Sequence, residues 1–223
     1  MYYWIEYLIY MLPAYLLVLI IQIWLKSTVS KYSKVSSCMC GAAAAELVLR
    51  SAGVTGVGIG QVSGSLTDNY DPSSSVIRLS DPVYSVSSVT AVGIAALEAG
   101  HAIQYAEDYG PARLRQASVK ICNIGSRLAV PLIFLGIFFA IKPLAIAGVA
   151  CFLLVIAFQL ITLPVEFNAS KRAVTILSGT CMFSDEEMKG VKKVLTAAAM
   201  TYVGSLALST MQLLFYVSRI KRR

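Results

Sequence analysis

Four stretches of the chain are almost entirely apolar, and the segments between them are polar and rich in turn residues. The stretches cover residues 7–25, 128–141, 144–163 and 194–217. A helix needs about 20 apolar residues to cross a bilayer. The first, third and fourth stretches are long enough, whereas the second is long enough only if it begins near Asn123 and includes Arg127. The pattern predicts about four transmembrane helices, with a re-entrant segment as the alternative for the second.

The segment between the first two stretches has shorter periodic patterns. Residues 41–51 are rich in alanine and predict a helix that Gly53 ends. Residues 54–62 alternate β-branched residues with glycine, residues 76–79 resemble a second strand, and turn residues crowd 67–72, so we expect a hairpin. Asp81 and Pro82 resemble a helix start, and Ser87 or Ser88 can cap a longer helix that runs to about Tyr105.

These elements predict a mainly α membrane protein with a small α+β domain between its first two spans. We expect an N-terminal transmembrane anchor at 1–25, a membrane-surface domain at 26–122 and a transmembrane hairpin at 123–163. A loop or helix at 164–193 and a C-terminal transmembrane helix with a basic tail at 194–223 complete the chain. A cleaved signal peptide is disfavoured for the first stretch, because it lacks a positive leading region and a small-residue cleavage site.

Composition and charge agree with a membrane protein. Only 14% of the residues are charged, against about 25% in soluble domains. The net charge of +7 does not indicate nucleic-acid binding, because the basic residues gather at the ends of the apolar stretches and the expected partner is the lipid bilayer. The positive-inside rule places the main domain in the cytoplasm and both termini outside, although the basic C-terminal tail opposes this orientation.

Residues 97–101, Leu-Glu-Ala-Gly-His, resemble the zincin motif H-E-x-x-H with its first histidine replaced. In that motif two histidines four residues apart bind zinc from one helical face, and the glutamate activates a zinc-bound water. Here Glu98 has the general-base position and His101, the single histidine of the chain, has the second ligand position. Leu97 stands at the degenerate ligand position and offers no lone pair.

A motif helix behind a short sheet is the minimal zincin layout, in which the edge strand holds an extended peptide. Asp68, Asn69 and Asp71 lie in the turn segment that would border such a groove. The alternative interpretation of these residues is an Asx-type hairpin turn with a purely structural role.

The chain resembles the bacterial membrane "neutral zinc metallopeptidase" family, often called YugP-like. The resemblance covers nearly the whole chain and is carried by residues 31–35, 66–72, 76–80, 98–104, 123–126, 163–170 and 197–203. It implies a membrane-anchored peptidase in a bacterial plasma membrane, with a zinc site built on H-E-x-G-H. It also implies that His101 and Glu166 are zinc ligands and that Glu98 is the general base. Glu166 follows Pro164, a helix breaker, which suits a carboxylate turned back toward a site at the membrane surface.

The departures from the family pattern bear on the chemistry. Leu97 replaces the first ligand, and Ser65 and Asn69 stand where the family segment carries histidines. A catalytic zinc has three protein ligands and a water, and two ligands would hold it weakly. Without the metal, Glu98 faces a water with a pKa near 15.7. The losses suggest relaxed selection on metal binding or a deliberate alteration.

Other interpretations of the same residues stay open. Asp68, Asp71 and Glu166 are types that would favour a hard cation such as Mg²⁺ or Ca²⁺. His101 is also compatible with a hydrogen-bonded interior histidine, and Glu98 with an ion-pair partner of Arg113 or Arg115.

The leading functional hypothesis is a pseudopeptidase that retains the substrate-shaped groove. It would bind peptide or protein segments, or pair with an active relative and regulate it. The rival hypothesis is an active membrane zinc metallopeptidase with an atypical ligand set, and a third is a member inactivated by design. The sequence leaves open whether the chain is an enzyme.

Overall fold

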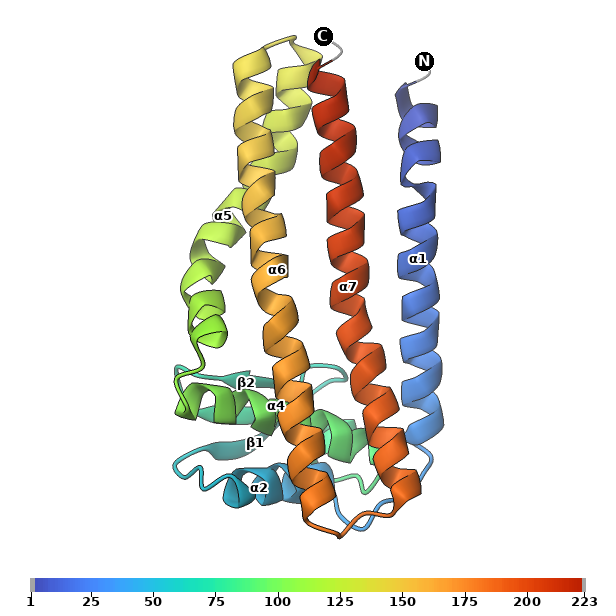
Figure 1. The fold of residues 1–223 in the computed structure, drawn as a ribbon, viewed down its shortest axis with the longest axis vertical. Coiled ribbons are helices and arrows are strands. Elements are labelled where there is room, and N and C mark those ends of the chain that lie inside the picture. Colours follow the sequence, from blue (N-terminus) through green and yellow to red (C-terminus); the bar gives the residue numbers. More distant parts are fainter. Residues whose placement is uncertain (1–2, 222–223) are drawn as a thin grey trace. The chain divides into compact units, whose positions relative to one another are not determined.

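The computed structural model describes residues 3–221, which form seven helices and three short strands (Figure 1). Residues 1–2, and Arg222 and Arg223 of the basic tail, lie outside the described residues. The described part forms two compact units. One comprises residues 3–22, 113–163 and 201–221, and the other comprises residues 23–112 and 164–200.

Four long helices supply the first unit and extend beyond it. They are α1 (Tyr3–Tyr32), α5 (Gly110–Phe138), α6 (Lys142–Gly179) and α7 (Asp185–Lys221). Each is long and apolar enough to cross a membrane. The prediction of four transmembrane helices is therefore confirmed at the level of length and composition, and the second apolar stretch belongs to one continuous helix, with Pro131 inside it.

The start of α1 and the end of α7 contact each other in the first unit. Glu6 on α1 forms an ion pair with Arg219 on α7, and the Arg219 guanidinium lies 5.0 Å from the centroid of the Phe215 ring. Figure 1 shows the start of α1 and the end of α7 at the same end of this unit. An even number of crossings requires both ends on the same side of a membrane, which this pairing satisfies.

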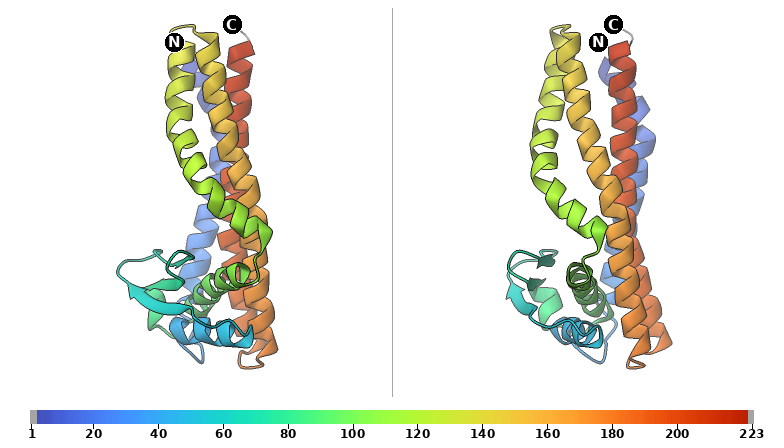
Figure 2. Two further views of the ribbon diagram at one scale, coloured as in Figure 1. Left: turned by 90° about the vertical axis from the view of Figure 1, so that its left-hand side faces the viewer. Right: turned by 60° about the vertical axis from the view of Figure 1, so that its left-hand side comes forward.

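The second unit carries the sheet and the motif helix. Its own elements are α2 (Gly41–Ser51), β1 (Gly58–Val62), β2 (Asn69–Asp71), β3 (Val76–Ser80), α3 (Asp81–Tyr84) and α4 (Val89–Ala106). The sheet order is β1-β3-β2, and both views of Figure 2 show the strands to one side of α2 and α4. The expected α+β composition is thus present.

The predicted hairpin between residues 54–62 and 76–79 is wrong. β1 pairs with β3 in parallel, and the strand antiparallel to β3 is β2, inside the segment expected to be only a turn. The connection after β1 is long enough for the chain to return to the starting end of the sheet, so β3 runs in the same direction as β1. The hairpin of this sheet is β2–β3.

The motif helix begins where its capping signal predicts. Ser88 is the N-cap of α4, and its Oγ accepts a hydrogen bond from the Ala91 N–H at 3.2 Å, which satisfies a backbone donor without an intrahelical partner. The helix ends at Ala106, one residue beyond the expected Tyr105. Alanines that are fully buried in α2 and α4 let the two helices pack closely; they are Ala44, Ala45, Ala91, Ala95, Ala96 and Ala99.

Pro164 does not break its helix, so the expectation of a carboxylate turned back by a chain break is wrong. α6 is continuous from Lys142 to Gly179 and carries both Pro164 and Glu166 in its interior. A proline removes one hydrogen bond from a helix, and the many other turns of this long helix preserve its course. Glu166 is therefore presented from a helical face.

Candidate functional site

The motif histidine and the expected third ligand lie side by side in the second unit. His101 Nε2 on α4 is 3.4 Å from Glu166 Oε2 on α6. Both side chains are buried, with His101 8% and Glu166 4% exposed. The structure therefore brings together two residues that are 65 positions apart in sequence and that the resemblance pairs as ligands.

Gln104 fixes the orientation and tautomer of the His101 ring. The Gln104 side-chain amide donates its two hydrogens to the Val165 carbonyl at 2.8 Å and to Asn168 Oδ1 at 3.0 Å. Gln104 Oε1 is then an acceptor, and it lies 3.1 Å from His101 Nδ1. His101 therefore carries a hydrogen on Nδ1, and its Nε2 faces the Glu166 carboxylate. An unprotonated Nε2 and an ionised carboxylate are both hydrogen-bond acceptors, so a proton or a cation is needed between them.

Further hydrogen bonds extend from the Gln104 side chain toward the protein surface. Asn168 Oδ1 also accepts from Arg172 Nε at 2.7 Å, and Arg172 donates to Glu107 at 2.6 Å, next to the C-terminal end of α4. These bonds connect α4 and α6 along one side of the site. A polar network holds its members in one arrangement when every member is satisfied.

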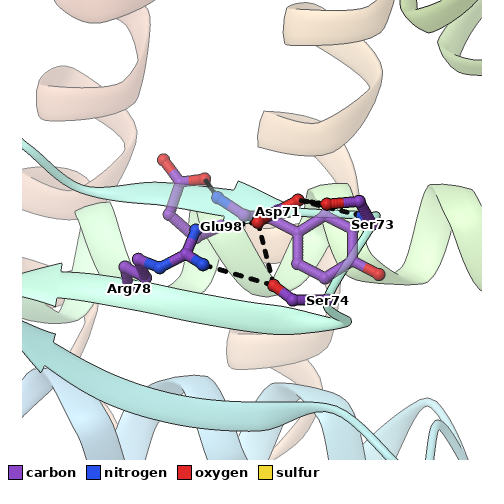
Figure 3. A network of polar contacts seen from close by, with 6 residues as sticks. Asp71, Ser73, Ser74, Arg78 and Glu98 are labelled. Atoms are coloured by element: carbon purple, nitrogen blue, oxygen red, sulfur yellow. Dashed lines mark hydrogen bonds and ion pairs between the residues drawn. The ribbon is translucent and has the colours of Figure 1, made fainter.

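Glu98 lies one turn before His101, against the edge of the sheet. Its Oε2 accepts a hydrogen bond from the Tyr70 N–H of β2 at 2.8 Å, as Figure 3 shows. This is a backbone partner, whereas the sequence suggested Arg113 or Arg115. In the β2–β3 register Tyr70 faces Ile77, and its N–H points away from β3. The Glu98 carboxylate therefore occupies a place that the carbonyl of an added strand would take.

The turn residues have structural roles. Asp71 Oδ1 accepts from the Ser73 N–H at 2.9 Å, which is the Asx-turn bond, and Asp71 Oδ2 accepts from Ser74 and Arg78 (Figure 3). These donors hold the pKa of Asp71 well below its usual range. Asp68 accepts from the Ser80 N–H at 2.7 Å and from its hydroxyl. The hydrogen bond of an Asx turn is thus present at Asp71, and Asn69 is an exposed residue of β2.

Burial and neighbouring charges shift the pKa values of both motif residues. Burial raises the pKa of Glu98, and the charge of Glu166 adds to this effect, while the His101 charge opposes it. Burial opposes the charged form of His101, but the Glu166 and Glu98 carboxylates outweigh it and raise the pKa of the imidazole. The pair therefore favours a proton on His101 Nε2, shared with Glu166.

The side chains present fall short of a complete zinc site. A catalytic zinc takes three protein donors, and here one imidazole nitrogen and one carboxylate converge. Leu97, on the same stripe of α4 as His101, packs partly buried against the apolar core and supplies no donor. Within residues 3–221, no group of three or more His, Cys, Asp or Glu side chains is placed to hold a metal ion, which also leaves the hard-cation alternative without support.

Sequence reasoning did not assign roles to Gln104, Asn168 or the Tyr70 N–H. Gln104 stands three residues after His101, so it lies on a neighbouring face of the same helix. That spacing was the available signal. Its partners on α6 could not be found without the tertiary packing.

Comparison with known proteins identifies the family of this chain. The family described as "Putative neutral zinc metallopeptidase" matches residues 7–221, which include both halves of the candidate site. The chain belongs to this family. A curated relative, "Putative membrane protease YugP" of Bacillus subtilis (strain 168), is 44% identical over 199 residues, which are 88% of each chain. No solved structure matches the chain.

Family membership agrees with the four candidate membrane helices and with a location in a membrane. The family implies zinc, and the structure places one imidazole and one carboxylate, of His101 and Glu166, side by side.

Proposed function

We propose that this chain is a membrane-embedded pseudopeptidase: a member of the zinc metallopeptidase family with impaired catalysis that binds extended peptide or protein segments. The observation that carries the proposal is the donor set, in which Leu97 replaces a ligand beside His101 and Glu166. Water activation by Glu98 needs a metal that lowers the water pKa from 15.7 to about 7. With two donors the chain holds such a metal weakly.

The binding function is supported by the edge of the zincin-like unit. The Tyr70 N–H of β2 is directed away from the sheet and is bonded to Glu98. Backbone groups of an edge strand bind an extended peptide without sequence-specific contacts. A backbone carbonyl of the bound segment would replace the Glu98 carboxylate as the hydrogen-bond acceptor of this N–H. The occupant is a peptide or membrane-protein segment, or an active relative that the chain regulates.

The alternative function is an active membrane zinc metallopeptidase with an atypical ligand set. The pair of His101 and Glu166, with the tautomer of the imidazole fixed by Gln104, favours it. An additional donor would then come from water or from the segment around Asp68.

Metal content separates the two functions. We expect the full chain, purified in detergent without a histidine tag or chelator, to contain far less than one zinc per chain by elemental mass spectrometry. The same should hold after zinc is added and excess is removed. His101→Gln and Glu166→Gln are the controls, since metal bound at this site must decrease in both. Near-stoichiometric zinc that is lost in these variants would overturn the pseudopeptidase and favour the active enzyme.

We also propose that the second unit lies in the cytoplasm of a bacterium, with the chain in the plasma membrane. The basic residues beside the helix ends on that side support this, among them Lys26, Lys31 and Lys34. Cys38 and Cys181 in this unit are exposed and free.

Cysteine labelling tests the orientation. We expect a membrane-impermeant maleimide to leave Cys38 and Cys181 unmodified in intact cells and to modify them after permeabilisation. The C38S/C181S variant is the control for labelling elsewhere. Rapid labelling of intact cells that this variant abolishes would place the unit outside.

A further inference from the structure

A surface pocket of about 480 Å³ lies in the second unit, away from the candidate site. The C-terminal end of α1, the segment that follows it and the first turns of α7 surround it. Its principal lining residues are Lys31, Tyr32, Val35, Glu186, Lys189 and Lys193. α7 packs directly on the wall of this pocket: a Cβ atom at Gly190 would lie 2.8 Å from the Tyr32 ring. The wall is therefore set by close helix packing.

Three lysines from two helices line this pocket. Within residues 3–221, Lys31, Lys189 and Lys193 form no salt bridge. The Lys31 ammonium lies 5.5 Å from the centroid of the Tyr32 ring, which places it against the pocket wall. Lysines that gather in a concavity with no carboxylate bound to them are a site for an anion.

The acidic residues of the pocket differ in what they do. Glu187 Oε1 accepts from Ser37 Oγ at 2.8 Å, and Glu187 Oε2 accepts from the Ser184 N–H and Oγ, each at 2.8 Å. This carboxylate caps α7 and fastens the segment after α1 to it. Glu186 also lines the pocket, and its carboxylate forms no hydrogen bond or ion pair among the described residues.

The lysines stand at the depth of lipid headgroups along their helices. Lys193 directly precedes the apolar stretch 194–217, and Lys31 follows the end of the stretch 7–25 by six residues, which is roughly 9 Å at 1.5 Å per residue. The headgroup region is about 5–8 Å thick on each side of a bilayer. Lys193 therefore lies within it, and the backbone of Lys31 lies at its outer edge, from which the long lysine side chain reaches it. Basic pockets between transmembrane helices at this depth bind lipid headgroups.

We propose that this pocket binds the phosphodiester headgroup of a single phospholipid from the adjacent leaflet. The ammonium groups of Lys31, Lys189 and Lys193 pair with the phosphate oxygens, and Val35 with the Tyr32 ring lies beside the glycerol backbone. The bound lipid joins the end of α1 to the start of α7. This site is independent of the proposed peptide-binding function.

Native mass spectrometry of the full chain in detergent, titrated with phosphatidylglycerol, tests the site. The lining variant is K31Q/K193Q. The matched control is K34Q/K192Q, which removes the same charge from neighbouring exposed positions outside the pocket. We expect the wild type and the control to retain the first bound lipid. In the lining variant the affinity for this lipid should fall at least about tenfold, because two close ion pairs are lost. Equal losses in both variants, or none in either, would overturn the proposal.

Competition identifies the source of the phosphate. We expect millimolar inorganic phosphate or glycerol phosphate to leave the bound lipid in place, because neither has acyl chains to anchor it. Displacement of the lipid by either of these anions, or by a polyglutamate peptide at equal concentration, would show that the pocket belongs to a soluble ligand and would overturn the lipid assignment.

Discussion

The Leu97→His variant should bind zinc at least about a hundredfold more tightly than the wild-type chain. The new imidazole would lie four residues before His101 on the same face of α4, and residues at this spacing are neighbours. It would complete a set of three donors with His101 Nε2 and Glu166. Structural zinc sites with four ligands are worth about 10–16 kcal/mol, so one ligand contributes roughly 3 kcal/mol, about a hundredfold. Competition with a zinc-binding dye in detergent measures the gain.

The variant Leu97→His/His101→Gln is the matched control. It has one histidine, as the wild type has, and therefore lacks the i, i+4 pair. It should bind zinc no better than the wild type. If Leu97→His alone brings no gain, the loss of the site extends beyond this residue and the pair of His101 and Glu166 is not an inherited metal site. A gain that persists in the double variant would place the zinc elsewhere.

The spans and the motif helix could be predicted because their signals are local. Apolar length defined the four long helices, and Ser88 with the 3.6-residue periodicity defined α4. The pairing of strands is not local. The sequence of residues 54–80 is compatible with a simple hairpin, and only the tertiary arrangement shows β3 between β1 and β2.

Part of the site could also be predicted, because the motif is a local signal. The motif spacing and the resemblance indicated that Glu98, His101 and Glu166 belong together, and the structure places His101 beside Glu166. The bonds that orient them arise from two different long-range contacts. Gln104 meets α6 and Glu98 meets the edge of β2, and neither partner leaves a signal in the local pattern.

Gly100 shows how closely the site depends on helix packing. It stands directly before His101, and a Cβ atom there would lie 2.6 Å from the Ala169 carbonyl oxygen and 3.1 Å from its carbonyl carbon. These are backbone atoms of α6, so they cannot move aside as a flexible side chain would. The close approach of α4 to α6 at this point brings His101 within reach of Glu166.

The Gly100→Ala variant should therefore be destabilised, whereas Gly93→Ala in the same helix should not. Overpacking costs about 1–3 kcal/mol, while alanine in place of glycine in a helix interior stabilises by about 1 kcal/mol. At Gly93 the nearest atoms to a new Cβ are 3.8 Å away, an ordinary contact, so only the gain applies. The propensity gain is common to both variants, so we expect their free energies of unfolding in detergent to differ by the overpacking cost, roughly 1–3 kcal/mol. The displacement of α6 should also cancel the zinc affinity gained by Leu97→His. Equal stability of the two alanine variants would contradict a rigid contact between α4 and α6 and would leave the position of Glu166 without its support.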